Sequence, residues 1–291
     1  MLYDIKLTIG YQYETAANGG RHLLRMVPRT IDGVQRVVLS NLDCEPTPAE
    51  RIDRTDFFGN ATIALRFDDP MEMENFHMRA RVERFPATVK ADNSPVLSQL
   101  KDELHELNSV AHDSPHHFLA SSTLVKPDTA VTEWALAFCE DTASVRSTAW
   151  RICSGLHEWM KFDPGATFVD TPLAEAFKAR HGVCQDFTHI MIAALRALGI
   201  PAGYISGFLR TIPPEGTERL EGADAMHAWV RVWCGLQIGW VEFDPTNNME
   251  AGEDHVIVAY GRDYFDVAPV IGNFRLSGSQ RSSQSVDMIP L

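Results

Sequence analysis

The chain has 291 residues, and 45% of them are hydrophobic, so it is long enough for more than one domain around a buried core. Its formal net charge of −13 disfavours nucleic acid and anionic membranes as partners, because both are negatively charged themselves. No apolar run approaches the roughly 20 residues that span a bilayer, and the first residues lack a signal-peptide pattern. The five cysteines are odd in number and contain no CxxC pair, which predicts reduced thiols and a cytoplasmic location.

The first 88 residues show the alternation of short antiparallel strands. Tyr3, Ile5 and Leu7 lie on one face of a predicted strand, with polar residues on the other. Asn18-Gly19-Gly20 is a turn signal. Similar alternating runs follow at residues 22–27, 34–41, 61–67 and 76–82. This spacing predicts an antiparallel β-sandwich domain over residues 1–88.

Residues 89–127 are predicted to form a helical linker segment, because Leu97, Leu100 and Leu104 recur at the spacing of one helix face. Residues 128–291 are predicted to form a second domain in which helices come before strands. Helices are expected at 128–138, 145–159, 171–182 and 184–198, and strands at 203–209, 227–233, 239–244 and 255–260. The serine- and glutamine-rich residues 277–285 predict a mobile tail before a last short strand at Val286 and Met288. The pattern is that of an α+β fold.

Cys184 is the most informative residue of the second domain. It follows Gly182, which ends one helical pattern, and it opens the next. The positive end of a helix dipole favours a thiolate, so this position suits a nucleophile. His227 and Asp244 come later, each at the edge of a strand-like run. A cysteine followed by a histidine and an acid is compatible with acyl transfer through a thioester.

The strands at 227–233 and 239–244 read as a hairpin. With Cys234–Gln237 as its loop, Trp233 faces Ile238 and His227 faces Asp244. Directly opposed residues share a face, with Cβ atoms roughly 5 Å apart. A slip by one residue would place the ring and the carboxylate on opposite faces, so the predicted pairing is specific.

This arrangement predicts a role for each residue. His227 would take the proton of Cys184, and Asp244 would fix the tautomer and orientation of the ring. The backbone N–H of Cys184 is a candidate oxyanion donor. Gln185 and the loop over 162–171 both remain open as the source of a second donor.

Two further residues are candidates for substrate contact. Asp186 suits either a backbone amide or an amine substrate, and the structural role is favoured because carboxylates suit the first turn of a helix. For Trp229, a packing role that shields the site is favoured over a role as a platform for the substrate. The histidines at 112, 116 and 117 lack the paired acid or thiol of a known metal site. We therefore predict no metal and no cofactor.

Several segments resemble the transglutaminase-like superfamily, with its papain-like core. They are Gly182-Val183-Cys184-Gln185-Asp186-Phe187, His227-Ala228-Trp229-Val230, Gly239-Trp240-Val241-Glu242-Phe243-Asp244-Pro245 and Gly261-Arg262-Asp263-Tyr264. Asp56-Phe57-Phe58-Gly59-Asn60 is similar to the β-rich N-terminal region of the bacterial members. The resemblance implies a papain-like transglutaminase core behind a β-sandwich, and a catalytic set at Cys184, His227 and Asp244.

The resemblance leaves the reaction open, because the superfamily includes crosslinking enzymes, peptidases, amidases and inactive scaffolds. We expect a cysteine-dependent amide-bond hydrolase that acts on a peptide, a protein or a small amide. Hydrolysis is favoured because ligation needs an amine site and exclusion of water, and the sequence offers no clear sign of either. Acyl transfer to an amine and a non-catalytic protein-binding scaffold are the alternatives. The sequence predicts no oligomeric state.

Overall fold

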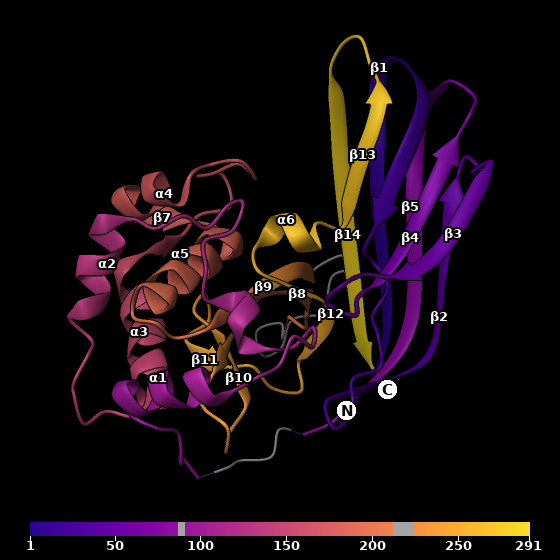
Figure 1. Ribbon diagram of the computed structural model, residues 1–291. Coiled ribbons are helices and arrows are strands. Elements are labelled where there is room, and N and C mark those ends of the chain that lie inside the picture. Colours follow the sequence, from indigo (N-terminus) through magenta and orange to yellow (C-terminus); the bar gives the residue numbers. More distant parts are fainter. Residues whose placement is uncertain (87–90, 212–223) are drawn as a thin grey trace, which may run out of the picture.

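The computed structural model describes residues 1–86, 91–211 and 224–291, and shows a β-rich part beside a part that mixes helices and strands (Figure 1). The predicted domain boundary between residues 88 and 89 lies outside the described residues. Within the described ranges, no helix has both the length and the apolar character needed to cross a bilayer.

Seven antiparallel strands make up the β-rich part, in the order β2-β5-β1-β4-β3 with β13 and β14 also paired to β1. Their bounds are β1 (Leu2–Leu24), β2 (Gln35–Glu45), β3 (Glu50–Thr55), β4 (Ala61–Phe67), β5 (Met71–Arg84), β13 (Val270–Arg275) and β14 (Gln280–Pro290). The first part of β1 pairs with β5 and β14, and its end pairs with β4 and β13. The two halves pack together, since the ring of His22 lies 5.8 Å from that of Phe76. The predicted β-rich N-terminal region is confirmed.

Two local predictions for this part are wrong. The turn expected at Asn18-Gly19-Gly20 does not form, because β1 continues through it with a shift of register between Asn18 and Gly20. The tail expected to be mobile over 277–285 lies largely in β14, which pairs with β1 from Tyr13–Gln280 to Tyr3–Pro290. A strand is held by backbone hydrogen bonds, so exposed polar side chains do not prevent it when a partner strand lies alongside. Val286 and Met288 are buried in the same strand.

The mixed part has a five-stranded sheet in the order β11-β10-β9-β8-β12. Its strands are β8 (Ala202–Leu209), β9 (Ala225–Trp233), β10 (Trp240–Asp244), β11 (Met249–Glu250) and β12 (His255–Gly261), and a separate short pair joins β6 (Lys161–Phe162) to β7 (His181–Gly182). The helices are α1 (Leu97–Glu106), α2 (Thr129–Leu136), α3 (Val145–Trp159), α4 (Leu173–Ala179), α5 (Cys184–Ala197), α6 (Tyr264–Val267) and the 3-10 turn η1 (Pro115–Phe118). The α+β prediction is confirmed.

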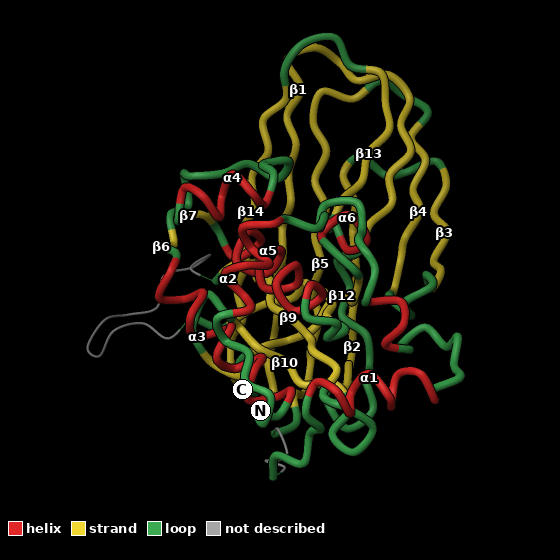
Figure 2. The backbone as a smooth tube through the Cα atoms, turned by 60° about the vertical axis from the view of Figure 1, so that its left-hand side comes forward, coloured by secondary structure: helices red, strands yellow, loops and turns green. Residues whose placement is uncertain are grey.

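Helix α5 is the centre of this part. It packs against β8 and β9 on one side and against α2, α3 and α4 on the other. Most of its apolar residues are buried, with Phe187 and Ile190 almost completely enclosed. The helix ends at Ala197, and Gly199 follows with a φ of +77°, the left-handed conformation that glycine adopts readily. Figure 2 shows the helices gathered around α5, with the strands of the β-rich part extending beyond them.

The two parts meet along β12, which is the last strand of its sheet and has an open edge. The side-chain amide of Gln35 donates to Ile257 O at 2.8 Å and accepts from Ile257 N at 2.9 Å. Asn60 does the same at Tyr260, at 2.7 and 2.8 Å. Arg84 Nε donates to His255 O at 2.7 Å. Side chains of the β-rich part thus satisfy backbone groups that a further strand would otherwise bind.

Candidate active site

Cys184 is half-buried at the first position of α5, where no preceding helical turn supplies a partner for its backbone N–H. Asp186 fixes this helix start, because its Oδ2 accepts from Val183 N at 2.8 Å. Gly182 leaves room for that carboxylate, since a Cβ at this position would lie 2.6 Å from Asp186 Oδ2. The local sequence therefore places the thiol at the positive end of a well-capped helix.

His227 and Asp244 lie together on neighbouring strands, although the predicted hairpin register is wrong. Trp233 pairs with Trp240 rather than Ile238, a shift of two residues. The longer connection has positive φ at Gly235 and Gly239, and Cys234 N donates to Gly239 O at 2.8 Å. A shift by an even number keeps every side chain on its predicted face.

His227 Nε2 is 2.8 Å from Asp244 Oδ2, so the structure brings the ring and the carboxylate into direct contact.

The electrostatics of His227 favour its charged form. Burial lowers the pKa of this imidazole, but the hydrogen bonds to Asp244 and Cys184 and the charges of both partners outweigh burial and raise it to about 10. Because Nε2 faces Asp244, the other ring nitrogen is left for the thiol of Cys184. Of the three residues singled out from the sequence, His227 and Asp244 are hydrogen-bonded, and Cys184 is near enough to the ring to raise its pKa.

Asp244 is fully buried, and its carboxylate is surrounded by donors. Burial raises its pKa, but the hydrogen bonds from His227 and His255, the charge of His227 and the amide of Asn247 hold it well below its usual range. Oδ1 accepts from the backbone N–H groups of Thr246 and Asn247 at 3.0 and 3.1 Å. Oδ2 accepts from the Asn247 side chain at 2.7 Å. The carboxylate is therefore held as an anion in a fixed position.

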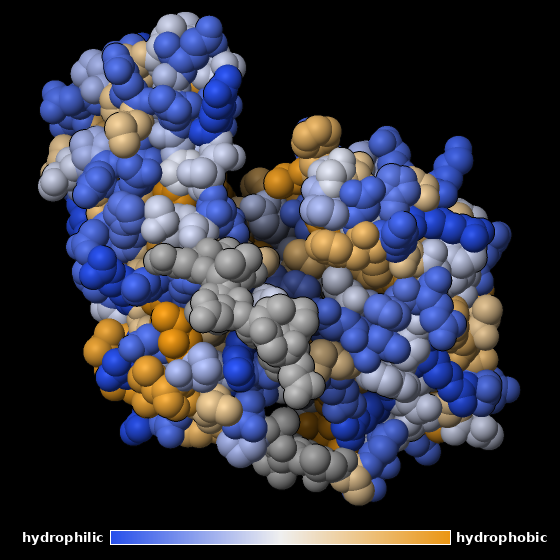
Figure 3. All heavy atoms as spheres, turned by 180° about the vertical axis from the view of Figure 1, so that it is seen from behind, coloured by the Kyte–Doolittle hydropathy of each residue, from blue (hydrophilic) through white to orange (hydrophobic). Residues whose placement is uncertain are grey.

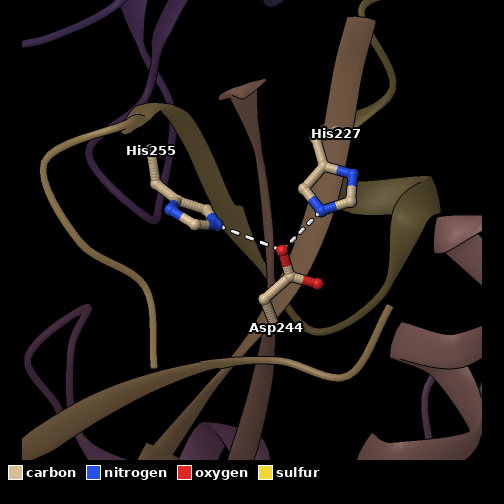
Figure 4. A group of neighbouring side chains, drawn as sticks. All are labelled: His227, Asp244 and His255. Carbon is tan, nitrogen blue, oxygen red and sulfur yellow. Dashed lines mark hydrogen bonds and ion pairs between the residues drawn. The ribbon is translucent and has the colours of Figure 1, made fainter. Parts of the chain in front are cut away.

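The sequence pattern does not single out His255, which the structure places on the other side of Asp244 (Figure 4). Its Nε2 lies 3.1 Å from Asp244 Oδ2, and its side chain is fully buried. The one signal in the sequence is a histidine that begins an otherwise apolar strand. The contact joins β12 to the end of β10, which are not adjacent in the sheet, so local patterning could not reveal it.

Ligand atoms of His227, Asp244 and His255 lie within 4.8 Å of one another, a spacing that would also suit a metal ion. The hydrogen bonds fit a metal poorly. Gly252 N donates to His255 Nδ1 at 3.3 Å, which puts the ring proton on Nε2, the atom that faces Asp244. The Asn247 amide occupies the remaining side of the same carboxylate oxygen. A protonated nitrogen and an amide N–H₂ group do not bind cations.

The predicted substrate-contact residues next to Cys184 both hold the loop over residues 163–171. Gln185 Nε2 donates to Val169 O at 2.9 Å, so its amide is already bound to this loop. Thr167 Oγ1 donates to Asp186 Oδ2 at 2.6 Å. Both Gln185 and Asp186 are buried, whereas Phe168 in the loop is 81% exposed. The structure places these two side chains beneath the loop rather than free in the open site.

Trp229 packs against the site as one of its walls. Its ring is fully buried, stacks at 6.2 Å on His227 and lies 5.1 Å from His255. Its Nε1 donates to Glu242 Oε2 at 2.9 Å, which satisfies the indole N–H. Tyr204, which the sequence pattern does not indicate, and Tyr264, from the segment Gly261-Arg262-Asp263-Tyr264, are both influenced by Cys184. Burial first, and the charge of Cys184 second, raise the pKa of Tyr204 and Tyr264.

The space-filling view shows a notch between the β-rich part and the helical part, with hydrophobic side chains along its rim (Figure 3). The described chain also has exposed apolar side chains at Phe168 and Val169 in the loop and at Phe265 in α6. Val169 is bound to Gln185 at the start of α5, and Phe265 follows Tyr264, whose backbone N–H donates to His189 farther along the same helix.

Comparison with known proteins matches both parts of the chain. Residues 132–245 match the transglutaminase-like superfamily, and residues 3–83 match the bacterial transglutaminase-like N-terminal region. An uncharacterized protein of Mycobacterium tuberculosis is 31% identical over 262 residues, which cover 88% of this chain and 82% of the relative. A protein-glutamine gamma-glutamyltransferase of Pseudomonas aeruginosa is 37% identical over 84 residues, which cover 28% of this chain and 12% of that protein.

One solved structure is similar over almost the whole chain. It is the crystal structure of a protein from Cytophaga hutchinsonii that is designated a candidate cysteine protease. The two share 21% identity with a TM-score of 0.76, over 99% of this chain and 90% of the other. This likeness shows the fold. Both parts of the chain match family models, and a relative aligns with 88% of the chain. The chain therefore belongs to the transglutaminase-like superfamily and carries a bacterial transglutaminase-like N-terminal region.

Proposed function

We propose that the protein is a cysteine-dependent amide-bond hydrolase, a peptidase or amidase that acts through a thioester at Cys184. The observation that carries the proposal is the network from Cys184 through His227 to the buried Asp244. A raised pKa at His227 keeps a positive charge on the ring beside Cys184, and a neighbouring cation favours the nucleophilic form of a cysteine.

The reaction would proceed in two halves. The Cys184 thiolate attacks the amide carbonyl, and the backbone N–H of Cys184 donates to the resulting oxyanion. The C–N bond breaks as the His227 imidazolium gives its proton to the departing amine, which leaves a thioester on Cys184. His227 then takes a proton from water, hydroxide attacks the thioester, and the proton passes to the departing sulfur. Asp244 keeps the ring oriented throughout.

Water is the acceptor we favour, because transfer to an amine needs a site that holds the amine and excludes water. The designation of the Cytophaga protein supports hydrolysis. The name of the Pseudomonas relative supports the alternative, in which a primary amine accepts the acyl group. The substrate class that fits both is a peptide, a protein or a small amide.

A cytoplasmic location is part of the proposal. All five cysteines are free, and Cys153 and Cys234 are buried as ordinary core thiols. Burial raises the pKa of the Cys153 thiol to about 12, so it stays protonated and unreactive. A reducing compartment keeps the nucleophile at Cys184 in its working state.

Limiting iodoacetamide tests the activated thiol. We expect selective alkylation of Cys184, read by peptide mass spectrometry, and loss of that selectivity in His227→Ala. Cys153 is the internal control. Slow and equal labelling of all five cysteines would instead support a non-catalytic scaffold.

Screening a peptide and isopeptide library, with and without an added amine, tests the reaction. We expect hydrolysis that Cys184→Ala abolishes while the melting temperature stays nearly unchanged. Asp244→Asn should cost less activity than His227→Ala, since the acid orients the ring and does not transfer the proton. Products that form only in the presence of the amine would favour the transferase.

A further inference from the structure

His255 is placed to hold the catalytic carboxylate from the side opposite His227. It is the first residue of β12, it is fully buried, and its Nε2 lies 3.1 Å from Asp244 Oδ2. The same oxygen lies 2.8 Å from His227 Nε2. One carboxylate oxygen therefore joins two imidazoles, as Figure 4 shows.

The tautomer of His255 follows from its second contact. Gly252 N–H donates to Nδ1 at 3.3 Å, so Nδ1 must offer a lone pair and Nε2 must carry the proton. His255 is therefore a neutral donor toward Asp244. A neutral donor stabilises the Asp244 anion without bringing a second positive charge to it, so it does not compete with the His227 imidazolium for the carboxylate.

The backbone that carries His255 is itself held in place. Arg84 donates to His255 O at 2.7 Å, and the side-chain amide of Gln35 binds both backbone groups of Ile257 two residues later. The ring of Trp229 lies 5.1 Å from the His255 ring at an angle of 72° and packs beside both histidines. The donor therefore sits on a rigid element, as precise orientation requires.

We propose that His255 is a positioning residue of the catalytic site, which fixes Asp244 and through it the ring of His227. This inference rests on the proposed function, because it assigns a role within the same network. Without the His255 N–H, Asp244 Oδ2 loses one of its donors in a buried site, and the carboxylate shifts toward another partner. The His227 imidazolium is then held less well beside the sulfur of Cys184, and the thiol reacts more slowly with an electrophile.

The test compares two substitutions at His255 with a matched buried histidine elsewhere. His255→Leu removes the donor. His255→Gln keeps an N–H at the end of a side chain that reaches about as far as Nε2 of histidine. His22→Leu is the control, since His22 is buried against Glu74 in the β-rich part and does not touch the site. The readouts are the second-order rate constant for iodoacetamide at Cys184 and the melting temperature.

We expect His255→Leu to slow alkylation of Cys184 by about tenfold, the loss that corresponds to one hydrogen bond to a charged group. His255→Gln should recover most of the rate. His22→Leu should lower the melting temperature and leave the rate constant unchanged. An unchanged or faster rate in His255→Leu, or equal losses in the Leu and Gln variants, would overturn the positioning role. If the wild-type protein shows no selective alkylation, the proposed function itself fails.

A spectroscopic measurement covers the case in which His255→Leu does not fold. Histidine ¹⁵N chemical shifts of the Cys184→Ala protein at neutral pH report the protonation of each ring nitrogen. We expect His255 to carry its proton on Nε2, with a bare Nδ1. A proton on Nδ1 together with a bare Nε2 would overturn the inference, because Nε2 could then not donate to Asp244.

Discussion

At the scale of single residues, the imidazole of His227 links activity to stability. Its pKa rises from 6.5 to about 10 on folding, because the contacts with Asp244 and Cys184 outweigh the effect of burial. A raised pKa means that the folded protein binds the proton more tightly than the unfolded chain does. The stabilisation is therefore complete below about pH 6.5 and is lost as the pH rises toward about 10.

The direction of this pKa shift predicts how the melting temperature of a His227 variant depends on pH. His227→Gln should lower the melting temperature most at pH values below 6.5, and the difference from wild type should shrink between pH 6.5 and 10. Subtracting the two melting curves at each pH removes the contributions of groups that both proteins share. A difference that stays constant or grows over this interval would contradict the raised pKa.

The individual contributions to this pKa can be separated by substitution. Cys184→Ala removes one hydrogen bond and one charge, so the pKa of His227 should fall, while Asp244 still holds it above 6.5. Adding Asp244→Asn removes the remaining charge and leaves burial, which should carry the pKa below 6.5. Titration followed by NMR measures both steps. If His227 titrates identically in the wild-type and Cys184→Ala proteins, the thiol does not contact the ring.

At the scale of elements, local sequence patterns predict the helices and strands themselves better than they predict how these elements pair. The helix behind Cys184 and the strands of the hairpin follow from apolar spacing and glycine punctuation. The predicted hairpin register is wrong by two residues, because the glycines at 235 and 239 allow a longer connection than a four-residue loop. The faces remained correct because strand side chains alternate with a period of two. His255 was missed because its strand and that of Asp244 are not adjacent in the sheet.

The loop over residues 163–171 depends on the start of α5 for its position. Gln185→Leu keeps the approximate size of the side chain but removes the amide that binds Val169 O. We expect faster amide hydrogen exchange across this loop, with a fall in the free energy of unfolding of about 1 kcal/mol, the net value of one hydrogen bond. Gln99→Leu on the exposed face of α1 is the matched control and should change neither quantity. Unchanged exchange in the Gln185 variant would show that the loop is held by other contacts.

At the scale of the whole molecule, the β-rich part completes the sheet that carries the site. Gln35 and Asn60 each bind both backbone groups of one residue in β12, and Arg84 binds the carbonyl of His255. Strands β13 and β14 come from the end of the chain and pair with β1. Contacts between residues some 200 positions apart, such as Asn60 with Tyr260, leave no trace in local spacing. The sequence could therefore predict the two parts, and not how they join.

The contact between the β-rich part and β12 can be tested by isosteric substitutions. Asn60→Asp and Gln35→Glu keep the shape of each side chain but replace the N–H₂ donor with an oxygen that faces the carbonyl of Tyr260 or Ile257. Both side chains are fully buried, so each change should lower the free energy of unfolding by about 1–3 kcal/mol or more. Asn273→Asp, at an exposed position of β13, is the matched control and should have little effect. Because β12 carries His255, the two buried variants should also slow iodoacetamide alkylation of Cys184 under conditions in which they remain folded. Destabilisation with an unchanged alkylation rate would mean that the β-rich part supports the fold of the core but not the geometry of its catalytic residues.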